Sequence, residues 1–108
     1  MLKHYHDFIG GIHIPPFWSL GWHQSRWGYK TLQDMTNMVK NYNEAKIPID
    51  IVWSDLDYME EKAIFTLDKY AYPADEFSEM LEEENVHWVP LIDVGVYLKD
   101  KESINAGK

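Results

Sequence analysis

Hydrophobic positions along the chain follow two periodicities. Three short apolar runs, at residues 17–22, 49–53 and 86–92, have the length and composition of buried strands. Between the first two runs, apolar residues recur at spacings of three and four, the period of a helix with one buried face. The residues of this helical pattern are Leu32, Met35, Met38, Val39, Tyr42 and Ala45. A second helix before the third run has an apolar face formed by Phe77, Met80 and Leu81.

Local signals predict where these helices begin and end. Thr31 and Asp34 have the spacing of a capping pair, so the first helix is expected to begin there. It is expected to end near Lys46, because Pro48 cannot continue a helix. The second helix is expected to begin after Pro73, because proline is favoured at the start of a helix. The chain is therefore expected to run strand, helix, strand, helix, strand.

This alternation predicts an α/β fold with parallel strands. A complete (β/α)8 barrel of about 250 residues uses about 31 residues per unit, so a chain of 108 residues corresponds to about three units. We therefore expect a partial TIM (β/α)8 barrel with three strands and two intervening helices, after a short leading segment. An open flavodoxin-like sheet is the competing fold, although residues 27–29, Trp-Gly-Tyr, are bulky where its phosphate-binding loop is slim.

Composition narrows the possible partners. With 18 acidic and 10 basic residues the formal charge is −8, which repels phosphate backbones and anionic lipids, so neither nucleic acid nor a membrane surface is expected as a partner. The chain has no cysteine, which excludes disulfides, thiolate metal sites and a cysteine nucleophile. His4 and His6 have no third ligand at suitable spacing, so no metal is predicted.

Acidic and aromatic residues gather where the predicted strands end. Asp55 and Asp57 follow the second strand and would face the same side of an extended chain, and Asp93 ends the third strand. The aromatic residues at the end of the first strand are Trp22, Trp27 and Tyr29. In a barrel, the carboxyl ends of the strands form the active site. Aromatic rings pack on the CH-rich face of a sugar and carboxylates accept hydrogen bonds from its hydroxyls, so this mixture predicts a carbohydrate site.

Each of these residues also has a structural explanation. An aspartate after a strand often caps the following helix. Trp18, Trp53 and Trp88 fall inside the predicted strands and are expected to pack in the core. The sequence contains no GxSxG, phosphate-loop or HExxH pattern. The residues by themselves therefore indicate a ligand class and do not name a reaction.

Three segments of the chain resemble glycoside hydrolase family 31, the α-glucosidase family. Residues 15–29, Pro-Pro-Phe-Trp-Ser-Leu-Gly-Trp-His-Gln-Ser-Arg-Trp-Gly-Tyr, are similar to the first barrel strand of that family. Residues 47–59, Ile-Pro-Ile-Asp-Ile-Val-Trp-Ser-Asp-Leu-Asp-Tyr-Met, resemble its second strand. Residues 90–96 resemble its third strand, with Val94 where many members have proline. The resemblance implies that residues 15–108 are a fragment of the catalytic barrel with its first three strands, and that residues 1–14 are a connecting segment.

The resemblance implies an activity and a set of binding residues. Family members of this kind are exo-acting α-glucosidases that hydrolyse terminal α-linked glucose from oligosaccharides with retention of configuration. By resemblance, Asp55 would hydrogen-bond the terminal sugar in the −1 subsite, and Trp27 and Leu56 would line that subsite. Leu91 and Asp93 would approach the sugar from the third strand.

The resemblance also implies what must come from elsewhere. The family's nucleophile follows the fourth strand, so we expect no catalytic residue in this chain, no activity of the chain alone, and no cofactor. A sheet of three parallel strands leaves two edges unpaired, so the rest of the barrel or a partner chain is expected to cover them. The alternative is a non-catalytic, truncated barrel segment that serves as a structural or interaction subunit.

Overall fold

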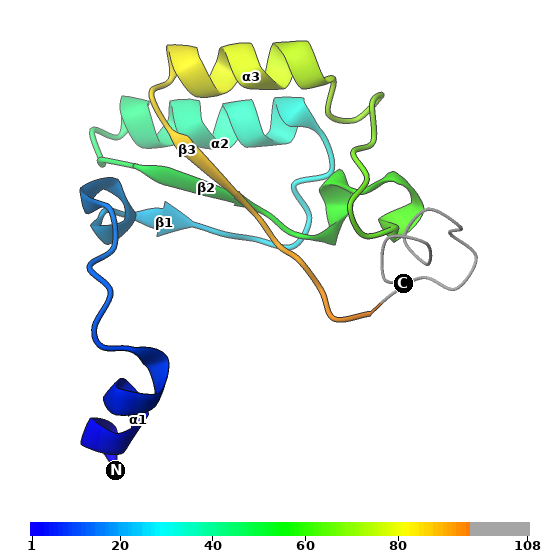
Figure 1. Ribbon diagram of the computed structural model, residues 1–108. Coiled ribbons are helices and arrows are strands. Elements are labelled where there is room, and N and C mark those ends of the chain that lie inside the picture. The colour runs from blue at the N-terminus through cyan, green and yellow to red at the C-terminus, as the bar shows by residue number, and fades with distance from the viewer. Residues whose placement is uncertain (96–108) are drawn as a thin grey trace.

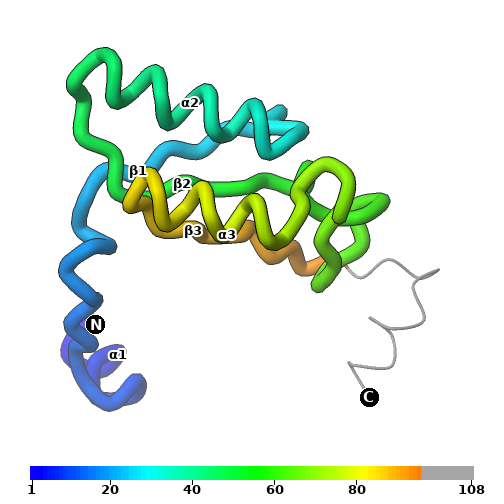
Figure 2. The backbone as a smooth tube through the Cα atoms, turned by 90° about the horizontal axis from the view of Figure 1, so that it is seen from above, coloured from blue at the N-terminus to red at the C-terminus, as the bar shows by residue number. Residues whose placement is uncertain are grey.

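The computed structural model describes residues 1–95 and shows helices stacked on one small sheet (Figure 1). Along the chain the elements are α1 (Leu2–Ile9), the 3-10 helix η1 (Phe17–Leu20), β1 (His23–Gln24), α2 (Leu32–Glu44), β2 (Ile51–Ser54), the 3-10 helices η2 (Leu56–Tyr58) and η3 (Glu60–Lys62), α3 (Ala74–Glu83) and β3 (His87–Pro90). Both α2 and α3 lie on the same face of the sheet (Figure 1 and Figure 2).

The sheet topology confirms the predicted fold class. Strands β1, β2 and β3 are parallel and lie side by side in chain order. Ile51 in the central strand is opposite His23 on one side and His87 on the other. The described strands have no reversal of strand order, which an open doubly wound sheet needs. They have the arrangement of consecutive units of a TIM (β/α)8 barrel.

The two predicted helices form where the sequence signals place them. Thr31 and Asp34 make a complete capping box, in which the Thr31 side chain accepts a hydrogen bond from the Asp34 amide and the Asp34 side chain accepts one from the Thr31 amide. Helix α2 ends at Glu44, before Pro48, and α3 begins directly after Pro73. The second and third predicted strands are confirmed too, as the shorter segments β2 and β3.

The prediction for the first strand was wrong in position. Residues 17–20 form the 3-10 helix η1, and the strand begins later, at His23. Pro16 starts the helical turn with a φ of −61°, and the Ser19 hydroxyl donates a hydrogen bond to the Pro16 carbonyl at 2.7 Å. Trp18 is therefore not a core residue of a strand: it is 39% exposed, and its ring stacks on His87 with 4.2 Å between centroids. A short apolar run does not by itself distinguish a strand from a helical turn.

A close contact joins the segment before β1 to the segment before β2. Asp50 Oδ2 accepts a hydrogen bond from the Trp22 amide at 3.0 Å, and the Trp22 carbonyl accepts from the amides of Asp50 and Ile51, at 3.1 Å each. Gly21 leaves the space that this contact needs, because a Cβ built there would lie 2.2 Å from Asp50 Oδ2. The amino-terminal ends of the first two strands are thus joined by the Asp50 carboxylate and by the Trp22 carbonyl.

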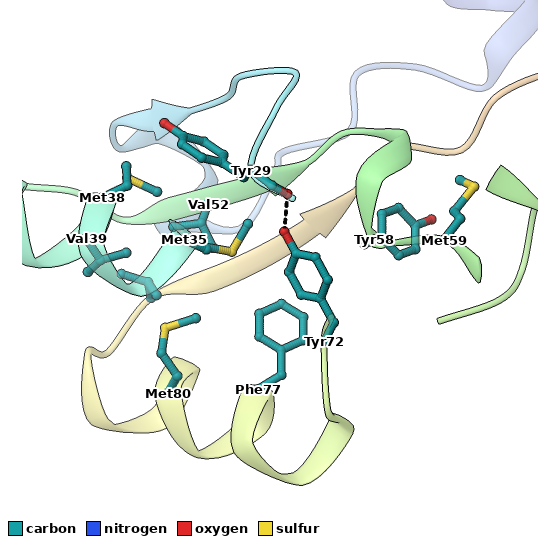
Figure 3. Packing of buried hydrophobic residues seen from close by; sticks show 11 residues of the cluster. Tyr29, Met35, Met38, Val39, Val52, Tyr58, Met59, Tyr72, Phe77 and Met80 are labelled. Carbon is teal, nitrogen blue, oxygen red and sulfur yellow. Dashed lines mark hydrogen bonds between the residues drawn. The ribbon is translucent and has the colours of Figure 1, made fainter. Parts of the chain in front are cut away.

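The hydrophobic core lies between the sheet and the two helices (Figure 3). Met35 and Val39 of α2 are fully buried above the central strand, where Val52 is also fully buried. Phe77 and Met80 complete the layer from α3. Trp88, which was expected in the core, is half-buried and packs against this cluster, with its ring centroid 4.9 Å from that of Phe77. Trp53, also expected there, is half-buried in β2 and is not among the described residues packed against the cluster. The core therefore belongs to the helix-covered face of the sheet.

The leading segment contains a helix that the sequence did not predict. Helix α1 ends at Ile9 and is capped by Gly10, whose φ of 83° is left-handed; none of the helix residues is buried. The assignment of residues 1–14 as a connecting segment remains a prediction. In the part of the chain that the structure describes, no helix has the length and hydropathy needed to cross a membrane.

Candidate functional site

The predicted binding residues come from three loops at one end of the sheet. Because the strands are parallel, their carboxyl ends share one edge, where barrel enzymes place their sites. Trp27 follows β1 and is 66% exposed. Asp55 and Leu56 follow β2 directly, and Leu91 follows β3; all three side chains are half-buried. The fold therefore brings four of the five residues to one end without burying them completely.

The chain after β2 turns at once into a helix. Asp55 caps η2, and its Oδ1 accepts a hydrogen bond from the Leu56 amide at 2.7 Å. The expectation that Asp55 and Asp57 face the same side rested on an extended chain and was wrong, because Asp57 lies inside η2. The capping tendency of an aspartate after a strand explains the turn. The two carboxylates therefore have different environments.

The Asp57 side chain is hydrogen-bonded to the loop that follows β1. Its Oδ2 accepts a hydrogen bond from the Gly28 amide at 2.8 Å, across 29 residues of sequence. Gly28 has a φ of 117°, in the region that side chains disfavour, so glycine suits this turn. The bond joins the loop of Trp27 to the helical turn that begins after Asp55.

Tyr29 anchors the far end of the same loop. The Tyr72 hydroxyl donates a hydrogen bond to the Tyr29 carbonyl (Figure 3), and Gln24 Nε2 donates to the Tyr29 hydroxyl at 3.0 Å. Tyr72 is fully buried, and this burial raises the pKa of its phenol to about 12; a side-chain hydrogen bond with Ser54 opposes the rise, and the negative charges of Asp57 and Asp34 add to it. At neutral pH the Tyr72 hydroxyl is therefore protonated and can donate its hydrogen bond to the Tyr29 carbonyl.

The end of β3 is fixed to the segment after β2. The Tyr58 hydroxyl donates to the Leu91 carbonyl at 3.0 Å, and the Leu91 amide donates to the Ser54 carbonyl at 2.9 Å. Trp88 Nε1 donates to the Ser54 hydroxyl at 2.9 Å. Burial of Tyr58 raises the pKa of its phenol. These contacts set the backbone position of Leu91, one of the predicted lining residues.

Asp93 lies at the outer margin of this end. It is exposed, and its Oδ1 accepts a hydrogen bond from the Val94 amide at 2.7 Å. The family resemblance of residues 90–96 extends to Val96, which lies outside the described residues. A sugar-binding role for Asp93 therefore remains a prediction.

A separate groove of about 870 Å³ lies between β1 and α2. Hydrogen bonds run along it from Trp22 Nε1 to the Tyr42 hydroxyl (3.2 Å), from Tyr42 to Gln24 Oε1 (2.6 Å), and from Gln24 to Tyr29 (3.0 Å). The sequence did not reveal this network, because Tyr42 in a helical pattern indicates packing and not a hydrogen bond. None of the five predicted sugar-binding residues lines the groove, so it is distinct from the predicted site.

His23, the first residue of β1, makes a hydrogen bond with each of its two ring nitrogens. His23 Nδ1 accepts a hydrogen bond from Trp53 Nε1 at 3.0 Å, which leaves Nε2 as the protonated nitrogen that donates to the Ser19 carbonyl at 2.9 Å. Both ring nitrogens are thus used within the protein. Across residues 1–95, no three histidine, aspartate or glutamate side chains come together as a metal site.

Comparison with known proteins gives a consistent picture. The sequence model of the glycosyl hydrolases family 31 TIM-barrel domain matches residues 12–108. A lysosomal acid alpha-glucosidase of Tetrahymena pyriformis is 43% identical over 102 residues, which are 92% of this chain and 11% of that protein. Glucoamylase 1 of Schwanniomyces occidentalis is 39% identical over 100 residues, 90% of this chain and 10% of that protein. The chain thus spans about a tenth of the length of these relatives.

Solved structures agree with the sequence comparison. The crystal structure of an alpha3-Glc2-bound glucosidase II alpha subunit superposes with a TM-score of 0.72 at 28% identity, over 82% of this chain and 10% of that one. A family 31 alpha-xylosidase of Xanthomonas citri, at 22% identity, has the same fold with a TM-score of 0.75 over 86% of this chain and 10% of that one. Since the family match covers nearly the whole sequence, the chain belongs to glycosyl hydrolase family 31 and is a part of its TIM-barrel domain.

Proposed function

We propose that this chain is a segment of a retaining, exo-acting α-glucosidase and that it contributes residues to the −1 subsite. Two of its relatives support the reaction class, since they are an alpha-glucosidase and a glucoamylase. The superposed glucosidase II alpha subunit was crystallised in an alpha3-Glc2-bound form, which supports an α-linked glucose oligosaccharide as substrate. The substrate would thus be a neutral sugar, as the acidic composition favours.

The observation that carries this proposal is the convergence of three loops at the carboxyl ends of β1, β2 and β3. The exposed indole of Trp27 would lie against the apolar face of the sugar ring. Asp55 would accept hydrogen bonds from the sugar hydroxyls with the carboxylate lone pairs that its capping bond does not use. Leu56 and Leu91 would line the subsite, and Asp93 would approach from its margin.

Catalysis in this proposal depends on residues outside the segment. A retaining glycosidase needs two carboxyl groups about 5–5.5 Å apart, one as nucleophile and one as acid and then base. Asp57 is bonded to the Gly28 amide and Asp55 to the Leu56 amide, so both carboxylates hold backbone groups in place. We therefore assign the catalytic pair to later strands of the barrel and the sugar contacts to this segment.

Hydrolysis of p-nitrophenyl α-glucoside tests the proposal. The 108-residue chain would be assayed beside the same polypeptide extended through the remaining barrel strands. We expect hydrolysis, with retention of configuration at the anomeric carbon by NMR, only in the extended form. A folded but inactive extended form would favour a structural subunit, and hydrolysis by the short chain would overturn our assignment of the catalytic pair.

A further inference from the structure

The loop between β1 and α2 is held by side chains at both of its ends. Gln24 and Tyr29 are joined by their side chains, and Tyr72 bonds the Tyr29 carbonyl from the core. In between, the Gly28 amide donates to Asp57 Oδ2 at 2.8 Å, the contact that joins the loop to η2. The loop is therefore hydrogen-bonded to Tyr72 in the core and to Asp57 in η2. Of these two bonds, the one to Asp57 is made by the residue that directly follows Trp27.

The bond to Asp57 is of the stronger, charge-assisted type, as are the bonds from the Lys30 and Thr31 amides to Asp34 at the end of the loop that adjoins α2. A carboxylate that accepts from a backbone amide makes a charge-assisted bond, which is about twice as strong as a bond between neutral groups. Asp57 is half-buried, so its bond is less screened by water than a bond at a fully exposed site. The left-handed φ of Gly28 is part of the turn that this bond holds.

Trp27 directly precedes this turn, and its side chain is mostly exposed. Its side chain is 66% exposed, and within the described residues its indole makes no hydrogen bond and no ring contact. The backbone on its carboxyl side is fixed by the bond between Gly28 and Asp57. The bond therefore fixes the backbone from which the Trp27 side chain extends.

We infer that Asp57 is a positioning residue that holds the turn at Gly28 and so fixes the Trp27 indole for contact with a sugar ring. The inference rests on the proposed function, because it assigns the sugar contact to Trp27. The two aspartates after β2 then have different roles. Asp55 contacts the sugar, and Asp57 orients the aromatic ring against which the sugar lies. Asp57 itself does not contact substrate.

The first test measures the turn itself, in the 108-residue chain. Amide hydrogen exchange of Gly28 would be followed by NMR in the unmodified chain, Asp57→Ala and Asp57→Asn. We expect Asp57→Ala to speed Gly28 exchange by about tenfold or more, since a hydrogen bond to a charged group is lost. Asp57→Asn keeps an acceptor oxygen and should retain most of the protection. Asp68→Asn is the matched control, because Asp68 bonds the amides of Tyr70 and Ala71 in another loop.

Two results would overturn the structural part of the inference. One is an unchanged Gly28 exchange rate in Asp57→Ala, which would mean that the bond does not hold the turn. The other is loss of the dispersed amide spectrum in both Asp57 variants, which would make Asp57 a residue of global stability. If Asp57→Ala alone unfolds, Asp57→Leu takes its place, because leucine is similar in size and has no acceptor oxygen; an unchanged Gly28 exchange rate in Asp57→Leu would count against the inference.

The second test asks whether Asp57 acts through Trp27. In the extended polypeptide, kcat/KM for p-nitrophenyl α-glucoside would be measured for Asp57→Ala, Trp27→Ala and the double variant. We expect each single variant to lose about tenfold, mainly through KM, and the double variant to be no worse than Trp27→Ala. Losses that multiply in the double variant would show that Asp57 acts independently of Trp27 and would refute the positioning role.

The two tests separate this inference from the proposed function. If the extended polypeptide hydrolyses no α-glucoside, the proposed function fails, while Gly28 exchange still reports whether Asp57 holds the turn. If hydrolysis is normal and the double variant shows independent losses, the positioning role alone fails.

Discussion

Replacing Gly21 with alanine should destabilise the protein although the backbone at this position suits any residue. Gly21 has a φ of −78° and a ψ of −165°, which alanine adopts without strain. The cost comes from space, because the new Cβ would lie 2.2 Å from Asp50 Oδ2, 2.3 Å from its Cγ and 2.7 Å from its Cβ. Moving Asp50 away would break its bond to the Trp22 amide. The substitution therefore forces either a steric overlap or a lost hydrogen bond.

The magnitude follows from these two effects. Overpacking of this kind typically costs about 1–3 kcal/mol, and loss of a hydrogen bond to a charged group costs about 1.5–3 kcal/mol when buried. Since the bond from the Trp22 amide is exposed, we expect the lower part of these ranges and a total loss of about 2 kcal/mol. Urea unfolding followed by far-UV circular dichroism would measure it.

A second background makes the prediction decisive. Asp50→Gly removes the three atoms that lie nearest to the new Cβ, so in that background Gly21→Ala should cost less than about 0.5 kcal/mol. Gly95→Ala is a matched control, because within residues 1–95 a Cβ at Gly95 would meet no heavy atom within 4 Å. An equal cost of Gly21→Ala in both backgrounds would refute the steric reasoning.

Three further predictions concern other parts of the chain. Thr31→Ala should lower the unfolding free energy by about 1 kcal/mol through loss of the capping box, whereas Thr31→Ser should be nearly neutral; urea unfolding compares the two. Asp55→Ala in the extended polypeptide should lower kcat/KM for an α-glucoside by the equivalent of about 1.5–3 kcal/mol, and unchanged kinetics would contradict its assignment. Tyr72 has its pKa raised by burial from 10.0 to about 12, so its stabilisation is complete below pH 10 and is lost as pH rises through about 12. Tyr72→Phe should flatten that decline in stability, measured by thermal unfolding across this range.

The sequence contained enough information for the regular parts of the fold. Thr31, Asp34 and Pro48 are local signals whose effect depends only on neighbouring residues, and α2 begins and ends as they indicate. The apolar run before Asp55, predicted as a strand, forms β2, the central strand, which pairs with β1 and β3. The run that begins at Phe17 misled the prediction, since its aromatic content suited a buried strand while Pro16 starts a helical turn.

The candidate site was predictable in its location and less so in its contacts. Parallel strands bring their carboxyl ends together, so the fold class predicts that the loop after β1 lies near the segment after β2. The bond from Gly28 to Asp57 could not be predicted, because it crosses 29 residues and depends on the turn into η2. A glycine at position 28 is the one local feature that could have suggested an unusual backbone there, because glycine adopts a positive φ readily.

The position of β1 at the edge of the sheet has a consequence for the order in which such a barrel folds. Within the described residues β1 pairs with β2 alone, and the groove beside it has no residue of β2 or β3. In a closed barrel the first strand pairs with the last strand. The free edge of β1 would therefore be covered only after the last barrel strand has been synthesised. Pairing between strands so far apart in the sequence is slow to form. Until then β1 is open to wrong partners. With only His23 and Gln24 in ladder pairing, it offers them a very short template.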